Sequence, residues 1–394
     1  MQKFSKGFKL TIANAGISRL GTSAFDLMIL WIVLEVTHSA FLAGLGEGLL
    51  SLPLFFSFIL GALIDKMSHK KLMALVAGLV RAGSLAAVIL SLLVGSAFAL
   101  IASIYLSALV IGFTSDIMNS VRATWTKEFL SEAQYKSGSS ISSSISTLFD
   151  AAGYTLSGLI LSIDYLNAFL ILIAIFLVAT APLLLINEGK TLEVPFSPLE
   201  SMKEGLAFIR GHKAIAEAMI AAVIINLVFG MSGVMFAALV QIRFKLPAYY
   251  MSILIISVMA GALIGSAGAS KIRGRLGYIA SSSVAVAGAS SLAMGFSSSA
   301  LIDVLPALIM GIAVGVLTVA MTTAFLKIVP YDMMARVQGG FNTFTLAVTF
   351  ASGALGGALV ALIGARGSFM FVGVFVLISS VLWLGFKDLS SLEI

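Results

Sequence analysis

The sequence predicts an all-α membrane protein with twelve transmembrane helices in two pseudo-symmetric six-helix bundles. Of its 394 residues, 59% are hydrophobic and only 11% are charged, whereas a soluble domain carries about 25% charged residues. The apolar residues form runs of membrane length, about 20 residues each, joined by short polar turns. A longer polar break, rich in charged residues, separates these runs into two groups of six.

The apolar runs give the expected spans, because only helices and closed barrels satisfy all backbone polar groups in lipid. In the first half the spans cover residues 10–36, 40–64, 72–94, 98–124, 137–162 and 166–186. In the second half they cover residues 214–241, 248–270, 276–297, 301–326, 335–362 and 367–387. The expected domains are an N-terminal bundle at 1–186, a cytoplasmic central loop at 187–213 and a C-terminal bundle at 214–394.

The basic residues predict the orientation. The first apolar run extends to Val36, which is too long for the apolar core of a signal peptide, so we expect it to remain as the first helix. With twelve spans, 19 of the 24 Lys and Arg residues fall on the side of the two termini, and three fall on the other side. Since basic loops stay in the cytoplasm, both termini are expected to be cytoplasmic in a multi-pass protein of the cell membrane.

A short basic turn joins the second and third expected spans, at Gly61-Ala-Leu-Ile-Asp-Lys-Met-Ser-His-Lys-Lys71. A stop-transfer cluster would explain its lysines, but neither Gly61 nor a carboxylate at Asp65. The turn also has a counterpart about 200 residues later, where Gly261-Ala-Leu-Ile precedes the basic stretch Lys271–Arg275. This repetition favours two parallel six-helix halves.

Four residues of this turn match a known signature. Gly61, Asp65, Lys66 and Lys70 fit Gly-x-x-x-Asp-(Arg/Lys)-x-Gly-(Arg/Lys)-(Arg/Lys), with Ser68 in place of the second glycine. The chain therefore resembles the major facilitator superfamily, whose signature lies between helices 2 and 3.

Further stretches resemble the efflux branch that includes macrolide and siderophore exporters. They are Leu20-Gly21, Trp31 to Ala40, Pro53, and Val329-Pro330 followed by Ala335-Arg336-Val337. The resemblance implies secondary active export of a small, amphipathic or cationic solute by alternating access, with possible proton coupling. The alternatives are uptake or exchange of another solute, such as a metabolite, lipid or metal chelate, and a non-transporting membrane sensor.

Two departures concern coupling. Antiporters of the family often carry a proline between the glycines of helix 5, which is missing between Gly153 and Gly158. The arginine common in helix 4 of proton-coupled drug exporters is missing too, and Asp116 and Asn119 occupy that region. These departures argue against the usual arrangement for proton coupling.

The resemblance also implies a conformational role for Asp65. In the family, this aspartate contacts the positive N-terminus of helix 11 and a basic group from the end of helix 4, which here is Arg122. Such contacts form when the cytoplasmic side is closed, and they favour the outward-open state.

Charges within apolar spans are the candidates for binding and coupling, because each costs roughly 2.5–3.5 kcal/mol to insert. The candidates for substrate binding or proton coupling are Asp26, Glu47, Arg81, Asp116 and Asp150. Two further charged residues have structural interpretations. Arg19 is expected to snorkel to the surface, and Glu217 to favour a helix start. Asp303 is expected near the outer surface.

Asp26, Arg81 and Asp150 fall closest to the membrane midplane by residue count. Helices 1 and 5 line the cavity in related folds. We therefore predict that Asp26 titrates, and that an Asp150–Arg81 ion pair supports it.

The remaining residue types limit other functions. Glycines in expected helices 5 and 11 predict close helix packing, at Gly153, Gly158, Gly353, Gly356 and Gly357.

With no cysteine, three scattered histidines and no phosphate-binding loop, the sequence suggests neither an enzyme, a metal site nor a cofactor. The net charge of +6 comes from loops beside the membrane, so no nucleic-acid partner is expected. The expected partners are a small-molecule substrate, a coupling ion such as the proton and the lipid bilayer, around a monomer.

Overall fold

A computed structural model describes most of the chain. The residues outside the description are 1–3, 57–68, 132–133, 188–207, 209, 270, 330–333, 387–389 and 394. Only the backbone is described for residues 136, 334–336 and 338–347. The described chain is helical, apart from an isolated bridge between Arg275 and Glu393.

Contacts within the chain group its residues into two compact units. Unit 1 comprises Met1–Val36 and Leu49–Pro198, and unit 2 comprises Thr37–Gly48 and Leu199–Ile394. The first part of the second expected span therefore groups with unit 2. Most of the expected central loop lies outside the described residues, so its role as a domain boundary stays a prediction.

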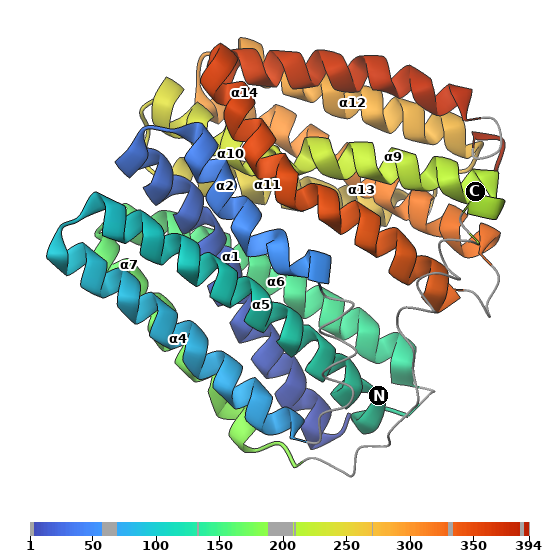
Figure 1. Cartoon of the computed structure of the whole chain (residues 1–394). Helices are drawn as coiled ribbons and strands as arrows, with labels where there is room; N and C mark the ends of the chain where they lie inside the picture. The colour runs from blue at the N-terminus through green and yellow to red at the C-terminus, as the bar shows by residue number, and fades with distance from the viewer. Residues whose placement is uncertain are drawn as a thin grey trace. The chain divides into compact units, whose positions relative to one another are not determined.

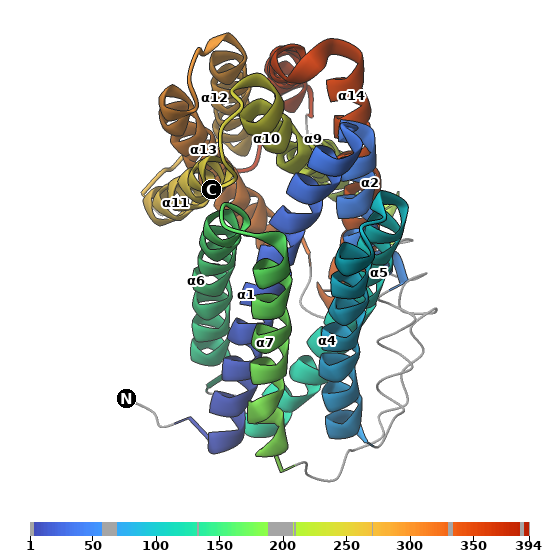
Figure 2. The same ribbon diagram turned by 90° about the vertical axis from the view of Figure 1, so that its left-hand side faces the viewer.

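The helices of unit 1 follow the predicted spans closely. They are α1 (Lys6–Thr37), the short 3-10 helix η1 (Leu52–Phe56), α4 (Lys70–Val94), α5 (Ala97–Phe129), α6 (Tyr135–Leu161) and α7 (Tyr165–Leu184). Helix α4 packs against both α5 and α7, and the three run side by side in Figures 1 and 2. Helix α2 (Ala40–Ser51) precedes η1 and joins the two units.

Local capping ends and restarts the helices at the turns of unit 1. Gly95 ends α4 in the left-handed conformation, with φ of 72°, and its N–H bonds to the carbonyls of Ser91 and Leu92. Ser96 then accepts a hydrogen bond from the N–H of Ala99 as the N-cap of α5. Asp164 caps α7 in the same way through Asn167.

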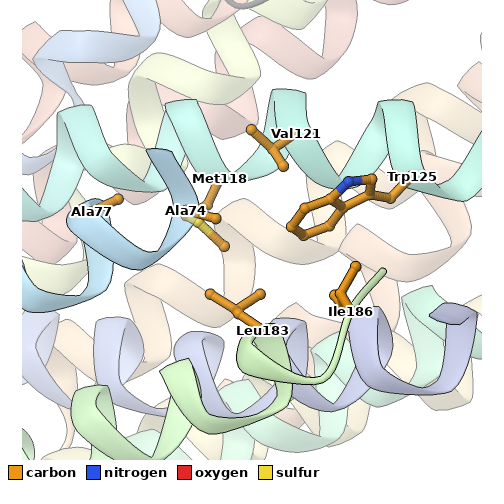
Figure 3. Close-up of a cluster of buried hydrophobic side chains, with 7 residues drawn as sticks. All are labelled: Ala74, Ala77, Met118, Val121, Trp125, Leu183 and Ile186. Atoms are coloured by element: carbon orange, nitrogen blue, oxygen red, sulfur yellow. The ribbon is translucent and has the colours of Figure 1, made fainter. Parts of the chain in front are cut away.

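An apolar cluster holds α4, α5 and α7 together (Figure 3). Trp125 and Met118 of α5 pack there against small residues of α4 and the end of α7. The cluster consists of Ala74, Ala77, Met118, Val121, Trp125, Leu183 and Ile186. Beside it, Lys71 Nζ donates hydrogen bonds of 2.8 Å to the carbonyls of Leu184 and Ile186. These bonds satisfy the carbonyls at the C-terminus of α7 and place a cation at its negative end.

Unit 2 contains the remaining helices. They are α9 (Lys213–Gly230), α10 (Ser232–Ala238), the π-helical turn η3 (Leu239–Arg243), α11 (Tyr249–Ala269), α12 (Leu276–Phe296), α13 (Ala300–Ile328) and α14 (Met334–Gly385). Gly364 interrupts α14 with φ of 73° and ψ of 168°. The interruption falls between the two last predicted spans, so α14 is two helices joined at a glycine. Helix α12 lies beside α14 (Figure 1).

Glycines bring two helix pairs of unit 2 into backbone contact. Between α11 and α13, a Cβ added at Gly261 or Gly265 would overlap backbone of α13, and one added at Gly311 or Gly315 would overlap backbone of α11. This reciprocal arrangement of two Gly-x-x-x-Gly stretches allows the close approach that membrane helices use for packing.

The second pair joins α2 to α14. A Cβ at Gly44 would overlap the carbonyl of Gly353, and a Cβ at Gly357 would overlap the carbonyl of Ala40. The glycines expected to pack in helix 11 therefore lie against the α2 segment of the same unit.

In the described part of the chain, nine helices are long and apolar enough to cross a membrane. The serine-rich α6 and the shorter α2 are outside this group, and α14 is included as one helix. The described residues therefore form a multi-pass membrane protein. The total of twelve helices stays a prediction, because residues 57–68 of the second expected span are not described.

Candidate functional site

A polar cluster connects α1 with α6 inside unit 1. Arg19 Nε donates to Asp150 Oδ1 at 2.6 Å, and Ser23 Oγ donates to the same oxygen. One turn further along α6, the hydroxyl of Tyr154 donates to Asp26 Oδ2 at 2.9 Å. We call these five residues the α1–α6 cluster.

The sequence places these five side chains on facing stripes. Arg19, Ser23 and Asp26 follow one another at helical spacing on α1, and Asp150 and Tyr154 are four residues apart on α6. Gly153 lies between the two α6 residues, where a Cβ would overlap the carbonyl oxygen of Leu20. The missing side chain thus lets the helices approach closely enough for short polar contacts.

The charges of the cluster are balanced unequally. Asp150 is 14% exposed and is paired with Arg19, which is 54% exposed. Asp26 is partly buried and accepts a hydrogen bond from the neutral hydroxyl of Tyr154. The cluster as a whole holds two carboxylates and one cation. One further positive charge would therefore make its net charge zero.

The predicted Asp150–Arg81 pair is wrong. Asp150 pairs with Arg19, because α6 packs against α1 at Gly153. Arg81 belongs to α4, which packs against α5 and α7, and its guanidinium lies 5.5 Å from the ring of Phe176. The expectation that Arg19 only snorkels to the surface is wrong as well, because it forms this ion pair.

Arg81 binds neutral groups of α5. Its Nε donates to Thr114 Oγ1 at 2.7 Å and its Nη2 donates to Ser115 Oγ at 3.0 Å. The side chain is 2% exposed.

Arg122 of α5 is bound by two asparagines. Its Nε donates to Asn14 Oδ1 at 2.9 Å, and its Nη1 donates to Asn119 Oδ1 at 3.3 Å. Asn14 Nδ2 in turn donates to the carbonyl of Ala179 at 2.6 Å. The expected contact between Arg122 and Asp65 cannot be compared with these bonds, because Gly61, Asp65 and Lys66 lie outside the described residues. Lys70 is described and is buried at the start of α4.

The remaining candidate residues from the sequence are not part of the α1–α6 cluster. Asp116 is 5% exposed on α5, and its Oδ2 has no hydrogen-bond partner among the described residues. Glu47 lies on the segment of α2 that packs against Gly353. Glu217 is buried in the second turn of α9. Asp303, expected near the outer face of the membrane, lies in the first turn of α13, where its side chain is buried within the protein.

Two residues of the cluster, Ser23 and Tyr154, were missed because neither carries a charge within its span. The spacing of four residues between Asp150 and Tyr154, and between Arg19 and Ser23, was the available signal. Among the described residues, no group of three or more His, Cys, Asp or Glu side chains could hold a metal ion.

Each unit also contains a pocket. The pocket of unit 1 is small, with about 10 Å³ of space for the centre of a water-sized sphere. It is lined by Asn14, Ser18, Ala74, Gly78, Arg81, Met118, Phe176, Ala179, Thr180 and Leu183. The pocket of unit 2 offers about 20 Å³ of space for the centre of a water-sized sphere and is mostly apolar. It is lined by Ile224, Ile225, Val228, Phe229, Ser283, Val284, Ala287, Ala313, Val314, Leu317, Val376, Ser379 and Trp383.

Solved structures with the same fold are transporters. A bacterial homologue of the iron transporter ferroportin is 14% identical, with a TM-score of 0.76, and 99% of this chain aligns with 100% of that one. The nucleoside transporter NupG is 14% identical, with a TM-score of 0.75 and coverage of 98% and 99%. A POT family transporter in complex with 5-aminolevulinic acid is 15% identical, with a TM-score of 0.75 and coverage of 97% and 96%.

These identities show a shared fold and leave the substrate open. A comparison with curated protein sequences finds no match. The profile of the Major Facilitator Superfamily matches residues 11–354, which is most of the chain. The protein therefore belongs to the major facilitator superfamily of membrane transporters.

Proposed function

We propose that this protein is a secondary active transporter that exports a small cationic or amphipathic solute by alternating access, with proton coupling. The observation that carries the proposal is the unequal charge balance of the α1–α6 cluster. Asp150 is neutralised by Arg19, whereas Asp26 is held by the hydroxyl of Tyr154. Asp26 is therefore the carboxylate of the cluster that a proton or a cationic solute can neutralise.

Competition for Asp26 would provide the coupling. A proton and a cationic solute can each neutralise this carboxylate, but both together would leave a net positive charge in a poorly solvated site. Binding of the solute then releases the proton, and rebinding of the proton releases the solute. Tyr154 orients the carboxylate in both cases, because its hydroxyl can donate to an ionised oxygen or remain bonded to the carbonyl oxygen of the acid.

The amphipathic character of the solute has a separate basis. The pocket of unit 2 is lined by branched aliphatic residues, Phe229 and Trp383, with two serines as its hydroxyl groups. Such a lining would suit the apolar portion of a solute. Export, rather than uptake, rests on the resemblance to the efflux branch.

Transport into proteoliposomes tests the proposal. Purified protein is reconstituted and offered a panel of cationic dyes, drugs and siderophores, with and without a pH gradient of either sign. We expect at least one cationic solute to move across the membrane in the direction opposite to the flow of protons. Asp26→Asn should abolish the dependence on the gradient. Asp164→Asn is the matched control, because Asp164 is an exposed N-cap and asparagine caps equally well.

Three outcomes would contradict parts of the proposal. Wild-type gradient dependence in Asp26→Asn would reject Asp26 as the coupling group, and Asp116 and Glu47 would be tested next. Solute movement in the same direction as protons would favour uptake. Binding of a protein partner without movement of any solute would favour the sensor function.

We also propose the family's conformational role for Asp65. A contact at the closed cytoplasmic side worth about 1–3 kcal/mol would shift the populations of the two states roughly 5–150-fold. Asp65→Asn should therefore increase the inward-open population, measured by spin-label distances across the cytoplasmic side. Unchanged distances would reject this role.

The cytoplasmic location of both termini is part of the proposal. A single cysteine at Ser68 can be introduced without background, because the chain has no native cysteine. A membrane-impermeant thiol reagent should label it only from the cytoplasmic side. Labelling only from outside would reverse the orientation.

A further inference from the structure

The pocket of unit 1 lies among four helices and presents a positive charge. Its lining comes from α1, α4, α5 and α7, and it includes Arg81, Asn14 and Ser18. It borders the apolar cluster of Figure 3, with which it shares Ala74, Met118 and Leu183. It is thus an interior feature of one helix bundle.

The charge of Arg81 has no acidic partner in the described part of the chain. Two of its three guanidinium nitrogens donate to the hydroxyls of Thr114 and Ser115, and the ring of Phe176 covers the group at 5.5 Å. The third nitrogen, Nη1, has no hydrogen-bond partner among the described residues. The ion pair that an arginine forms in this part of the chain is Arg19–Asp150. The guanidinium of Arg81 is thus 2% exposed and is not paired with a carboxylate in the described part of the chain.

A second cation increases the positive potential. Arg122 donates to Asn14, which also lines the pocket. Its Nη2 atom is buried and has no hydrogen-bond partner within the described part of the chain. Buried charges are normally paired, because desolvation of an isolated ion is costly. Among the described residues, both guanidiniums are thus held by neutral groups, and Arg81 is the one that lines the pocket.

The lining also offers a neutral donor. The hydroxyl of Ser18 has no hydrogen-bond partner among the described residues, and the residue is 5% exposed. Thr180, by contrast, already donates to the carbonyl of Leu177. The free donors at this pocket are thus Arg81 Nη1 and Ser18 Oγ.

We propose that this pocket binds a small monovalent anion of the chloride type, held by Arg81 and Ser18. The pocket leaves about 10 Å³ for the centre of a water-sized sphere, which is room for one small ion and not for an ion with a water molecule. The scarcity of donors and the apolar remainder of the lining disfavour a phosphate, which needs many hydrogen bonds. The anion would balance Arg81 and lock α4 to α1.

Direct binding of ³⁶Cl⁻ tests the site without requiring transport. Purified protein in sodium gluconate at constant ionic strength is titrated with ³⁶Cl⁻ in a scintillation proximity assay. We expect saturable binding of one anion per chain, with competition by bromide and nitrate and none by gluconate. The assay can fail while the transport proposal holds, and the reverse is also possible.

Variants locate the anion. Arg81→Gln should weaken binding about tenfold or more, because it removes the charged donor. Ser18→Ala removes only a hydroxyl, so it tests the site even if Arg81→Gln does not fold, and a several-fold loss is expected. Arg243→Gln is the matched control, because Arg243 is a part-buried arginine of unit 2 whose guanidinium donates to the carbonyls of Met294, Gly295 and Ser297.

Two results would overturn the proposal. The first is non-saturable ³⁶Cl⁻ binding by wild-type protein. The second is unchanged affinity in both Ser18→Ala and a folded Arg81 variant, either Arg81→Gln or Arg81→Lys, which would place any bound anion elsewhere.

Discussion

The two units differ in the contacts that hold their helices together. Unit 1 places charged side chains between helices, in the α1–α6 cluster and around Arg81 and Arg122. Unit 2 brings helix backbones together at glycines and encloses a mostly apolar pocket. Both kinds of contact suit a bilayer, because close van der Waals packing and hydrogen bonds between helices drive the association of membrane helices. Charged contacts between helices therefore lie mainly in unit 1, which also packs α1 closely against α6 at Gly153, whereas reciprocal glycine pairs join helices in unit 2.

The largest effect is expected from the glycine contacts of unit 2. Gly311→Leu would push a side chain into the backbone of α11 at Val258, and overpacking costs typically about 1–3 kcal/mol or more. We expect a large loss of folded protein in gel filtration and a lower melting temperature. Gly268→Leu is the control on α11, because no atom lies within 4 Å of a Cβ added there. Equal losses in both variants would contradict the packing role.

A smaller, functional effect is expected from the ion pair of unit 1. Asp150→Asn would release Arg19 to pair with Asp26 two turns away on α1, and so occupy the proposed site. We expect transport of a cationic solute to fall about tenfold, which corresponds to roughly 1.4 kcal/mol. Arg19→Gln in the Asp150→Asn background should then restore part of the rate in proteoliposomes. A double variant no faster than Asp150→Asn would argue against this competition.

The smallest effect is expected from the helix end capped by Lys71. Lys71→Met removes the cation that donates to the carbonyls of Leu184 and Ile186, and a cation at an exposed helix C-terminus is worth about 0.3–1 kcal/mol. We expect a modest decrease in the melting temperature. Lys127→Met, at an exposed lysine of α5, should leave it unchanged. Similar decreases for both lysines would mean that the capping bonds add little stability.

Hydropathy predicted the helices well because the bilayer fixes their length and composition. The predicted spans 72–94 and 276–297 differ from α4 and α12 by at most two residues at each end. The gap expected between the last two spans coincides with the left-handed Gly364.

The side-chain partners were harder to predict, because pairing depends on how each helix is rotated and which helix it meets. Arg81 and Asp150 have similar depths by residue count, yet they belong to helices that pack against different neighbours. The Gly-x-x-x-Gly stretches at 261–265 and 311–315 were visible in the sequence, but their reciprocal contact required the structure.

The exchange of a proton for the solute at Asp26 is the central claim, and solute-induced proton release tests it most directly. Purified protein in weakly buffered detergent solution is mixed with a transported cationic solute, and a pH indicator dye records the protons released per bound solute. The proposed mechanism predicts proton release by wild-type protein and by Asp164→Asn, and none by Asp26→Asn that still binds the solute. Undiminished release by Asp26→Asn would contradict it.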